Sequence, residues 1–178
     1  MYANNFRHGF AVYHTRQMKT RIASFGLVLV LAACGGGQTR DDKPSAPPTP
    51  EQVVSAAKTV LEQYEQGYEV LSVAALQPLY LEDLDLVVVV QGQPYKAWTS
   101  VEGYLTGFFS RFDAVRLDLA DISVVALGDD AAQVTATVTR ELRGGSTSVK
   151  EIGILSLTLS RVGERWLIRT EHFSYGLR

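Results

Sequence analysis

The side chains that could move a proton are few and widely spaced in this 178-residue chain. Of its three histidines, only His172 follows residue 14, and a neutral imidazole can act as acid or base near neutral pH. Its partner would be Asp83, Glu141 or Glu171, of which Glu171 is the least suitable because adjacent strand residues point to opposite faces. We expect His172 to be structural or ligand-contacting, and we assign no catalytic residue.

Aromatic side chains and one arginine form a second group, which could line a pocket for a small apolar or acidic ligand. The same aromatics would serve equally well as core, and Arg140 could be a solvated residue beside Glu141 and Arg143. The candidate pocket residues are Tyr64, Tyr80, Trp98, Tyr104, Phe108, Arg140, Trp166 and His172.

Metal and nucleic-acid chemistry are disfavoured by composition. With three histidines, two of them near the N-terminus, and a single cysteine, the chain offers no convincing metal-ligand set, and no cofactor is implied. The net charge is −2, so neither sign of charge dominates to attract nucleic acid.

The single cysteine, Cys34, follows a segment typical of export. Lys19 and Arg21 precede the apolar run Ile22–Ala32, as in a secretory signal, and the run is shorter than the ~20 residues of a membrane-spanning helix. The stretch Leu31-Ala32-Ala33-Cys34 resembles the lipobox of bacterial lipoproteins. That resemblance implies cleavage before Cys34 and a lipid on its thiol, which would bind the protein to a membrane.

The chain therefore divides into three parts. Residues 1–33 are predicted to be a leader and signal peptide. Translation would start at Met18 or, with a longer leader, at Met1. Residues 34–50 read as the lipidated cysteine and a flexible linker rich in Gly, Pro and Ser, and 51–178 as one folded domain. For a Gram-negative organism, Gly35 beside the lipidated cysteine implies the periplasmic side of the outer membrane, and in general we expect the cell envelope.

Helices are expected first in the folded part. Thr49 and Pro50 open an amphipathic helix whose apolar positions recur at three- and four-residue steps and which ends near Gly67. A short helix at Val73–Tyr80 follows. Strand Leu84–Val90 then turns at Gln91-Gly92 into Tyr95–Trp98, and Thr99 or Ser100 caps the next helix, whose apolar positions begin at Val101 and continue to Phe112.

Four long strands are expected after these helices. Glycine-containing turns separate them, and short turns between long strands make antiparallel neighbours. This order predicts an α+β domain with helices on one face of a curved antiparallel sheet. The expected strands are Val115–Leu127, Ala131–Arg143, Ser148–Arg161 and Arg165–Tyr175.

This order of elements resembles the NTF2-like superfamily, which includes SnoaL-like cyclases and ketosteroid isomerases. Local matches are Leu79-Tyr80-Leu81-Glu82-Asp83, Arg165-Trp166-Leu167-Ile168 and His172-Phe173-Ser174. The resemblance implies a cone with an apolar cavity, with Trp166 and His172 turned toward it, and homodimers are common for this fold. Tyr64 matches the isomerase tyrosine, but the position of the isomerase base falls in Val87–Val90, where no residue can take a proton.

Three functions follow as hypotheses. The first is a lipid-anchored, non-catalytic module that binds a small ligand, because no coherent acid–base pair is found. The second is a small isomerase, dehydratase or cyclase that uses His172 with Tyr64 and Asp83. The third is an envelope assembly protein whose outer sheet face, with Thr135, Thr137 and Thr139, pairs with a partner.

Overall fold

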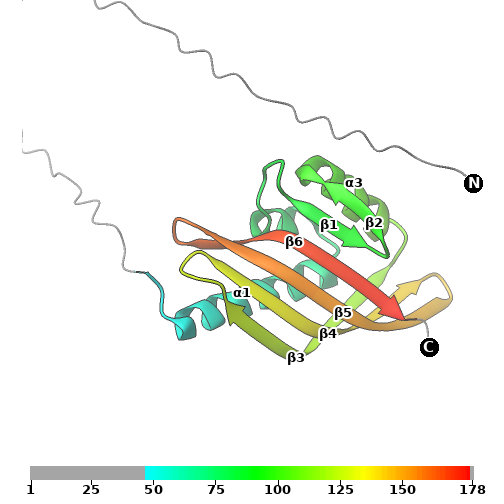
Figure 1. Ribbon diagram of the computed structural model, residues 1–178. Coiled ribbons are helices and arrows are strands. Elements are labelled where there is room, and N and C mark those ends of the chain that lie inside the picture. Colours follow the sequence, from blue (N-terminus) through cyan, green and yellow to red (C-terminus); the bar gives the residue numbers. More distant parts are fainter. Residues whose placement is uncertain (1–46, 177–178) are drawn as a thin grey trace, which may run out of the picture. The chain divides into compact units, whose positions relative to one another are not determined.

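The computed structural model describes residues 47–176, which form three α-helices, a short 3-10 helix and six strands (Figure 1). The leader, Cys34 and most of the linker lie outside the described residues. The helices are α1 (Pro50–Glu69), α2 (Val73–Leu76), the 3-10 helix η1 (Gln77–Leu79) and α3 (Ala97–Phe109). The strands are β1 (Val87–Val90), β2 (Gln93–Lys96), β3 (Ala114–Ala126), β4 (Ala131–Gly144), β5 (Thr147–Val162) and β6 (Arg165–Gly176).

Helix α1 begins where the sequence predicts. The Thr49 side chain accepts a hydrogen bond from the backbone N–H of Gln52, and the Gln52 side chain accepts one from the backbone N–H of Thr49. This reciprocal cap satisfies two N–H groups that the first turn leaves without partners. The apolar stripe of α1, which includes Tyr64 and Tyr68, is buried.

Helix α3 begins three or four residues earlier than predicted, since its N-cap is Lys96 and not Thr99 or Ser100. Strand β2 ends at Lys96 and passes directly into the helix at Ala97, whose backbone N–H donates to Leu86 O at 3.0 Å. Thr99 and Ser100 therefore lie inside the first turn, and the expectation that one of them caps α3 was wrong. The β1–β2 hairpin and its turn at Gln91-Gly92 are present as predicted, but its strands are displaced from the expected bounds: β1 begins only at Val87, β2 begins at Gln93, and Trp98 lies in α3.

The six strands form one sheet in the order β2-β1-β6-β5-β4-β3. The four long strands form an antiparallel meander, as expected, but β1 runs parallel to β6. The parallel pairing is possible because the chain passes through α3 and the whole meander before it returns beside β1. The β1–β2 hairpin thereby extends the sheet at the same end as α3 (Figure 1).

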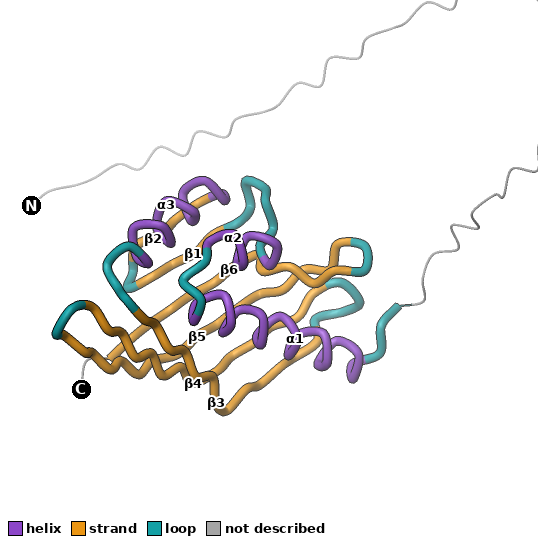
Figure 2. The backbone as a smooth tube through the Cα atoms, turned by 180° about the vertical axis from the view of Figure 1, so that it is seen from behind, coloured by secondary structure: helices purple, strands orange, loops and turns teal. Residues whose placement is uncertain are grey.

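Helix α1 lies along one face of the sheet, as the view from behind shows, and it contacts chiefly β3 and also β4 and β6 (Figure 2). The core lies between this helix and the inward residues of β4 and β5. These inward positions alternate regularly: Val134, Ala136, Val138 and Arg140 on β4 are buried. The outward set of β4, with Thr135, Thr137 and Thr139, is half-buried or exposed.

Strand β6 does not alternate regularly, and this changes the predicted site. Thr158 of β5 pairs with Thr170, but the next residue, Leu159, pairs with Ile168, so Arg169 is an extra residue in β6. Such a bulge shifts the side-chain alternation by one position. After the bulge, Glu171 faces inward with 2 % of its surface exposed, and His172 is exposed. The expectation that His172 faces the interior was therefore wrong.

Candidate functional site

A single carboxylate lies in the middle of the apolar core. Glu171 of β6 is opposite Leu157 of β5, and hydroxyls from two other elements bind its two oxygens. Tyr64 of α1 donates a hydrogen bond to Glu171 Oε1 at 2.8 Å, and Tyr80, just after η1, donates to Oε2 at 2.5 Å. Three segments far apart in the sequence thus meet at one carboxyl group.

A third tyrosine extends this hydrogen-bonded group. Tyr68 lies one turn beyond Tyr64 on α1, and their hydroxyl oxygens are 3.4 Å apart. Because the single proton of the Tyr64 hydroxyl is directed at Glu171, Tyr68 is the donor in this contact. Protonated Glu171 can in turn donate its proton to either of its two tyrosine partners. We call Glu171, Tyr64, Tyr68 and Tyr80 the tyrosine–glutamate cluster.

Burial controls the protonation of this cluster. Removal of the carboxylate from water raises the pKa of Glu171 to about 7, while the hydrogen bonds from Tyr80 and Tyr64 and the positive charge of Arg140 lower it in part. Burial also raises the pKa values of Tyr64, Tyr68 and Tyr80, so these tyrosines stay protonated as donors. Near neutral pH, Glu171 can therefore either hold or accept a proton.

Aromatic rings connect the tyrosine–glutamate cluster to the remainder of the core. The Trp98 ring lies 5.5 Å from that of Tyr80, and the Phe108 ring lies 6.3 Å from that of Tyr68. Tyr104 continues from Phe108 toward the surface at a ring distance of 6.0 Å. At that end, half-buried side chains are packed against the core: Tyr95, Tyr104, Phe112 and Tyr175. This end of the aromatic interior reaches the molecular surface.

Arg140 is the buried cation of the interior. Its Nε donates to Glu151 Oε2 at 2.9 Å and its Nη2 to the same oxygen at 2.5 Å, and only 6 % of the residue is exposed. The guanidinium packs against the Phe108 and Tyr175 rings, with Cζ 4.8 Å and 3.9 Å from their centroids. The sequence pattern did not decide which residues of β4 face inward, and in the structure Arg140 is one of them.

Six of the eight predicted pocket residues meet in this interior, joined by the contacts above: Tyr64, Tyr80, Trp98, Tyr104, Phe108 and Arg140. Trp166 is buried near the N-terminal end of β6 and takes no part in these contacts. His172 is on the outer face of the sheet. The partners considered for His172 are also outside: Asp83 is exposed, and half-buried Glu141 pairs with Lys150 at 3.1 Å.

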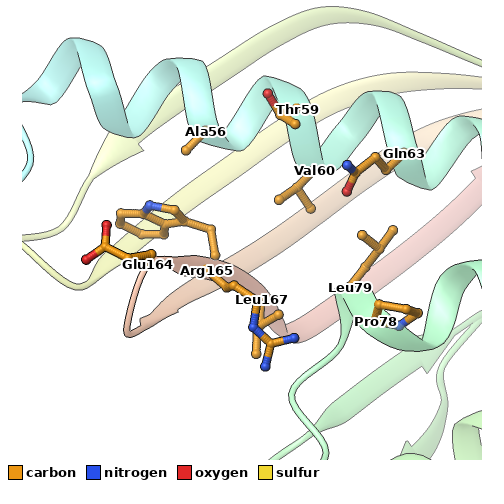
Figure 3. A pocket seen from close by; sticks show the side chains of 10 residues that line it. Ala56, Thr59, Val60, Gln63, Pro78, Leu79, Glu164, Arg165 and Leu167 are labelled. Atoms are coloured by element: carbon orange, nitrogen blue, oxygen red, sulfur yellow. The ribbon is translucent and has the colours of Figure 1, made fainter.

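Trp166 lines a pocket between α1 and the turn from β5 to β6, with a volume of about 470 Å³. Val60 and Gln63 of α1 and Leu79 of η1 converge on this pocket (Figure 3). A neighbouring pocket of about 400 Å³ continues along α1 past Gly67. No residue of the tyrosine–glutamate cluster lines either of these two pockets. The buried acid–base group and the surface pockets along α1 are therefore separate sites.

Residues 47–176 contain no group of three histidine, cysteine, aspartate or glutamate side chains placed to bind a metal. They also contain no helix with the length and apolar character needed to cross a membrane.

Sequence reasoning missed Glu171, although a signal was present. Apolar residues occupy even positions at Trp166 and Ile168 but odd positions at Phe173 and Tyr175. Such a change of phase within one strand indicates a bulge. Had it been recognised, Glu171 would have been placed on the same face as Phe173, inside the core.

The fold and sequence can be compared with those of known proteins. The SnoaL-like domain family matches residues 57–178. No curated protein matches the chain. A dehydratase candidate of the NTF2-like family from Streptomyces avermitilis is 18 % identical with a TM-score of 0.67, covering 73 % of this chain and 100 % of its own.

Two proteins from Novosphingobium aromaticivorans share the fold as well. A scytalone dehydratase candidate is 16 % identical with a TM-score of 0.63, covering 70 % of this chain and 84 % of its own. An aromatic ring hydroxylase candidate is 17 % identical with a TM-score of 0.67, and the coverages are 74 % and 94 %. At these identities the likeness establishes the NTF2-like fold. With the match over residues 57–178, it follows that this chain belongs to the SnoaL-like domain family.

Proposed function

We propose that the domain binds a small aromatic or apolar molecule in its interior and that Glu171 exchanges a proton with it. The observation that carries this proposal is the carboxyl group of Glu171, buried among aromatic rings and bound by Tyr64 and Tyr80. Buried acid–base groups with a pKa near the working pH concentrate at functional sites. This coherent acid–base group is what the sequence analysis did not find.

Each residue of the cluster has a distinct part in this proposal. Glu171 removes a proton from a carbon or oxygen of the ligand, and its pKa of about 7 lets it return that proton elsewhere on the molecule. Tyr64 and Tyr80 fix the carboxylate and share its charge through their hydrogen bonds. Isomerisation moves one proton between two positions of the ligand. Loss of water removes a C–H proton, breaks a C–O bond and returns the proton to the departing hydroxide, and two proteins of the same fold are named as dehydratase candidates.

A generic base-catalysed reaction tests the reactivity of Glu171 without knowledge of the natural substrate. In 5-nitrobenzisoxazole, loss of the ring C–H proton to a carboxylate breaks the N–O bond and releases a coloured cyanophenolate. We expect the purified domain to accelerate this reaction, with a rate that rises through the Glu171 pKa of about 7. Glu171→Gln should lower the rate by about 100-fold or more.

Two further variants sharpen this experiment. Tyr80→Phe removes a hydrogen bond that lowers the pKa of Glu171, so the midpoint of the rate profile should move to higher pH. His172→Ala changes an exposed residue on the outer face and should leave the rate unchanged. Equal rates for the wild-type protein and Glu171→Gln would refute the assignment of Glu171 as a base.

A second candidate function is binding without chemistry. This second function is favoured because Glu171 is inaccessible: both of its carboxylate oxygens already accept hydrogen bonds, and only 2 % of the residue is exposed. In that case the interior would hold a ligand that Glu171 contacts through a hydrogen bond only. A ligand that binds with the same affinity to Glu171→Gln and is released unchanged would establish this second function.

We also propose that the domain is attached to the cell envelope by a lipid on Cys34. The support comes from the sequence alone, namely the apolar run and small residues before Cys34 and the polar linker after it. Expressed in a bacterium, the wild-type chain should be in the membrane fraction, with the mass of a lipidated chain that begins at Cys34. Cys34→Ser should abolish both the added mass and membrane retention, and a variant retained as fully as the wild type would contradict the proposal.

A further inference from the structure

The Arg140–Glu151 pair does not use the full donor capacity of the arginine. Both hydrogen bonds run to one carboxylate oxygen, Glu151 Oε2, from Nε and Nη2. A guanidinium carries five N–H donors, two of them on Nη1, which Glu151 does not use. The Tyr104 side chain is a second partner of Arg140: burial raises the pKa of Tyr104 to about 12, while the charge of Arg140 and a hydrogen bond from it lower that pKa in part. The hydrogen bonds to Glu151 and the packing against the Phe108 and Tyr175 rings hold the guanidinium in place, so the direction of these donors is held as well.

The hydroxyl of Tyr175 is the second unusual feature of this region. Its oxygen is buried and has no hydrogen-bond partner, the only such side-chain atom within residues 47–176. A buried hydroxyl without a partner costs free energy, and such groups call for a ligand or a water. The Tyr175 ring can lie against Arg140 because its neighbour on β5 is Gly153, which has no side chain.

We propose that Arg140 and Tyr175 form an acceptor-binding subsite that holds a carbonyl or carboxylate oxygen of an aromatic ligand. The inference rests on the proposed function, because it names the class of molecule on which Glu171 acts. The ligand oxygen would accept from Nη1 of Arg140 and from the Tyr175 hydroxyl. The aromatic part would pack on Phe108 and Tyr104, whose rings lie 6.0 Å apart.

Position and charge both fit this subsite. Tyr104 and Tyr175 are half-buried, so the subsite lies where the aromatic interior reaches the surface, and Glu171 lies four residues earlier on the same face of β6. The two positions are about 13 Å apart along the strand backbone, so a ligand that extends from the subsite along this inner face toward Glu171 would be held at one end and deprotonated at the other. Glu151 offsets the charge of Arg140, so a neutral carbonyl oxygen is accepted as well as a carboxylate.

Three fluorinated probes of similar shape can test the subsite by fluorine NMR titration. 4-Fluoroacetophenone carries a carbonyl oxygen, 4-fluorobenzoate carries a carboxylate, and 1-ethyl-4-fluorobenzene carries neither. We expect at least one of the two oxygenated probes to bind about 10-fold more tightly than the hydrocarbon, as two hydrogen bonds allow. The better of the two shows whether a ketone or an acid is the preferred class.

Tyr175→Phe should reduce this preference about fivefold, the value of one hydrogen bond. The variant should have an unchanged or higher melting temperature, because it removes a buried hydroxyl without a partner. Ser174→Ala, on the exposed outer face of the same strand, should change neither quantity. Glu151→Gln keeps an acceptor for Arg140 but removes a charge, so it should strengthen benzoate binding relative to the ketone.

The proposal is overturned if none of the probes binds, if the hydrocarbon binds as tightly as the other two, or if Tyr175→Phe retains the full preference. These outcomes are separate from those that test Glu171 as a base. Glu171→Gln should keep the oxygen preference even though it loses proton transfer. Loss of the preference with retained proton transfer would reject the acceptor-binding subsite alone.

Discussion

The free energy of unfolding of the wild-type domain should fall by about 3 kcal/mol relative to Glu171→Gln as the pH rises from 4 to 8. The Glu171 pKa is about 7 in the folded state, against 4.5 for an exposed glutamate. Between these values the unfolded chain has lost the proton that the folded protein still holds, so unfolding becomes more favourable. The shift corresponds to roughly 1.4 kcal/mol per pKa unit.

The pH window of this effect follows from the sign of the shift. Below the unfolded pKa both states are protonated, and the contribution of Glu171 to stability is fully present. It is lost as the pH rises through the folded pKa, above which both states are ionised. Urea unfolding of both proteins across this range measures the difference. Glu102→Gln, an exposed substitution on α3, is the control and should show the same dependence of the free energy of unfolding on pH as the wild type. If the difference in this free energy between Glu171→Gln and wild type stayed constant with pH, the raised pKa of Glu171 would be disproved.

Gly153→Ala should destabilise the domain by about 3 kcal/mol or more, or prevent folding. A methyl group at Gly153 would overlap the backbone oxygen of Ser174 and lie 2.9 Å from the Tyr175 Cα. These are backbone atoms of the paired strand β6, so they can move only if the sheet itself is distorted. The quantity to measure is the free energy of unfolding in urea.

The matched control is a glycine with open space around it. Gly107 lies on the exposed side of α3, where a methyl group would meet no atom within 4 Å. Because alanine favours the helix over glycine, Gly107→Ala should stabilise the domain by about 0.5–1 kcal/mol. Opposite effects of the same substitution at the two positions would show that close strand packing, not loss of glycine, decides the result. Equal small effects would contradict the close packing of β5 on β6.

The elements of the domain could be predicted from local patterns. The cap at Thr49, the apolar stripe of α1 and the turn at Gln91-Gly92 each depend on residues a few positions apart, and the structure confirms them. The four long strands were likewise separated correctly by their glycine turns. The parallel pairing of β1 with β6 was not predicted, because it joins segments more than 80 residues apart with no local signal.

The candidate site was predicted only in part, for the same physical reason. The aromatic pocket residues on helices were identified because helical periodicity assigns them an inner face. Glu171 meets Tyr64 and Tyr80 across sequence separations of 107 and 91 residues, and only the assembled fold brings them together. Arg140 was ambiguous because a charged strand residue is more often exposed than buried.

The extra residue Arg169 makes the chemistry of the interior depend on the register of the strand as well as on its residues. With the bulge, Glu171 is opposite Leu157 and faces the two tyrosine hydroxyls. A strand of the same length in regular register would place Thr170 opposite Leu157 and turn Glu171 to the outer face. Loss of the bulge alone would therefore replace the carboxylic acid of this interior by a hydroxyl without any change of sequence in the surrounding wall, whereas deletion of Arg169 would restore regular pairing and leave the carboxylic acid in place.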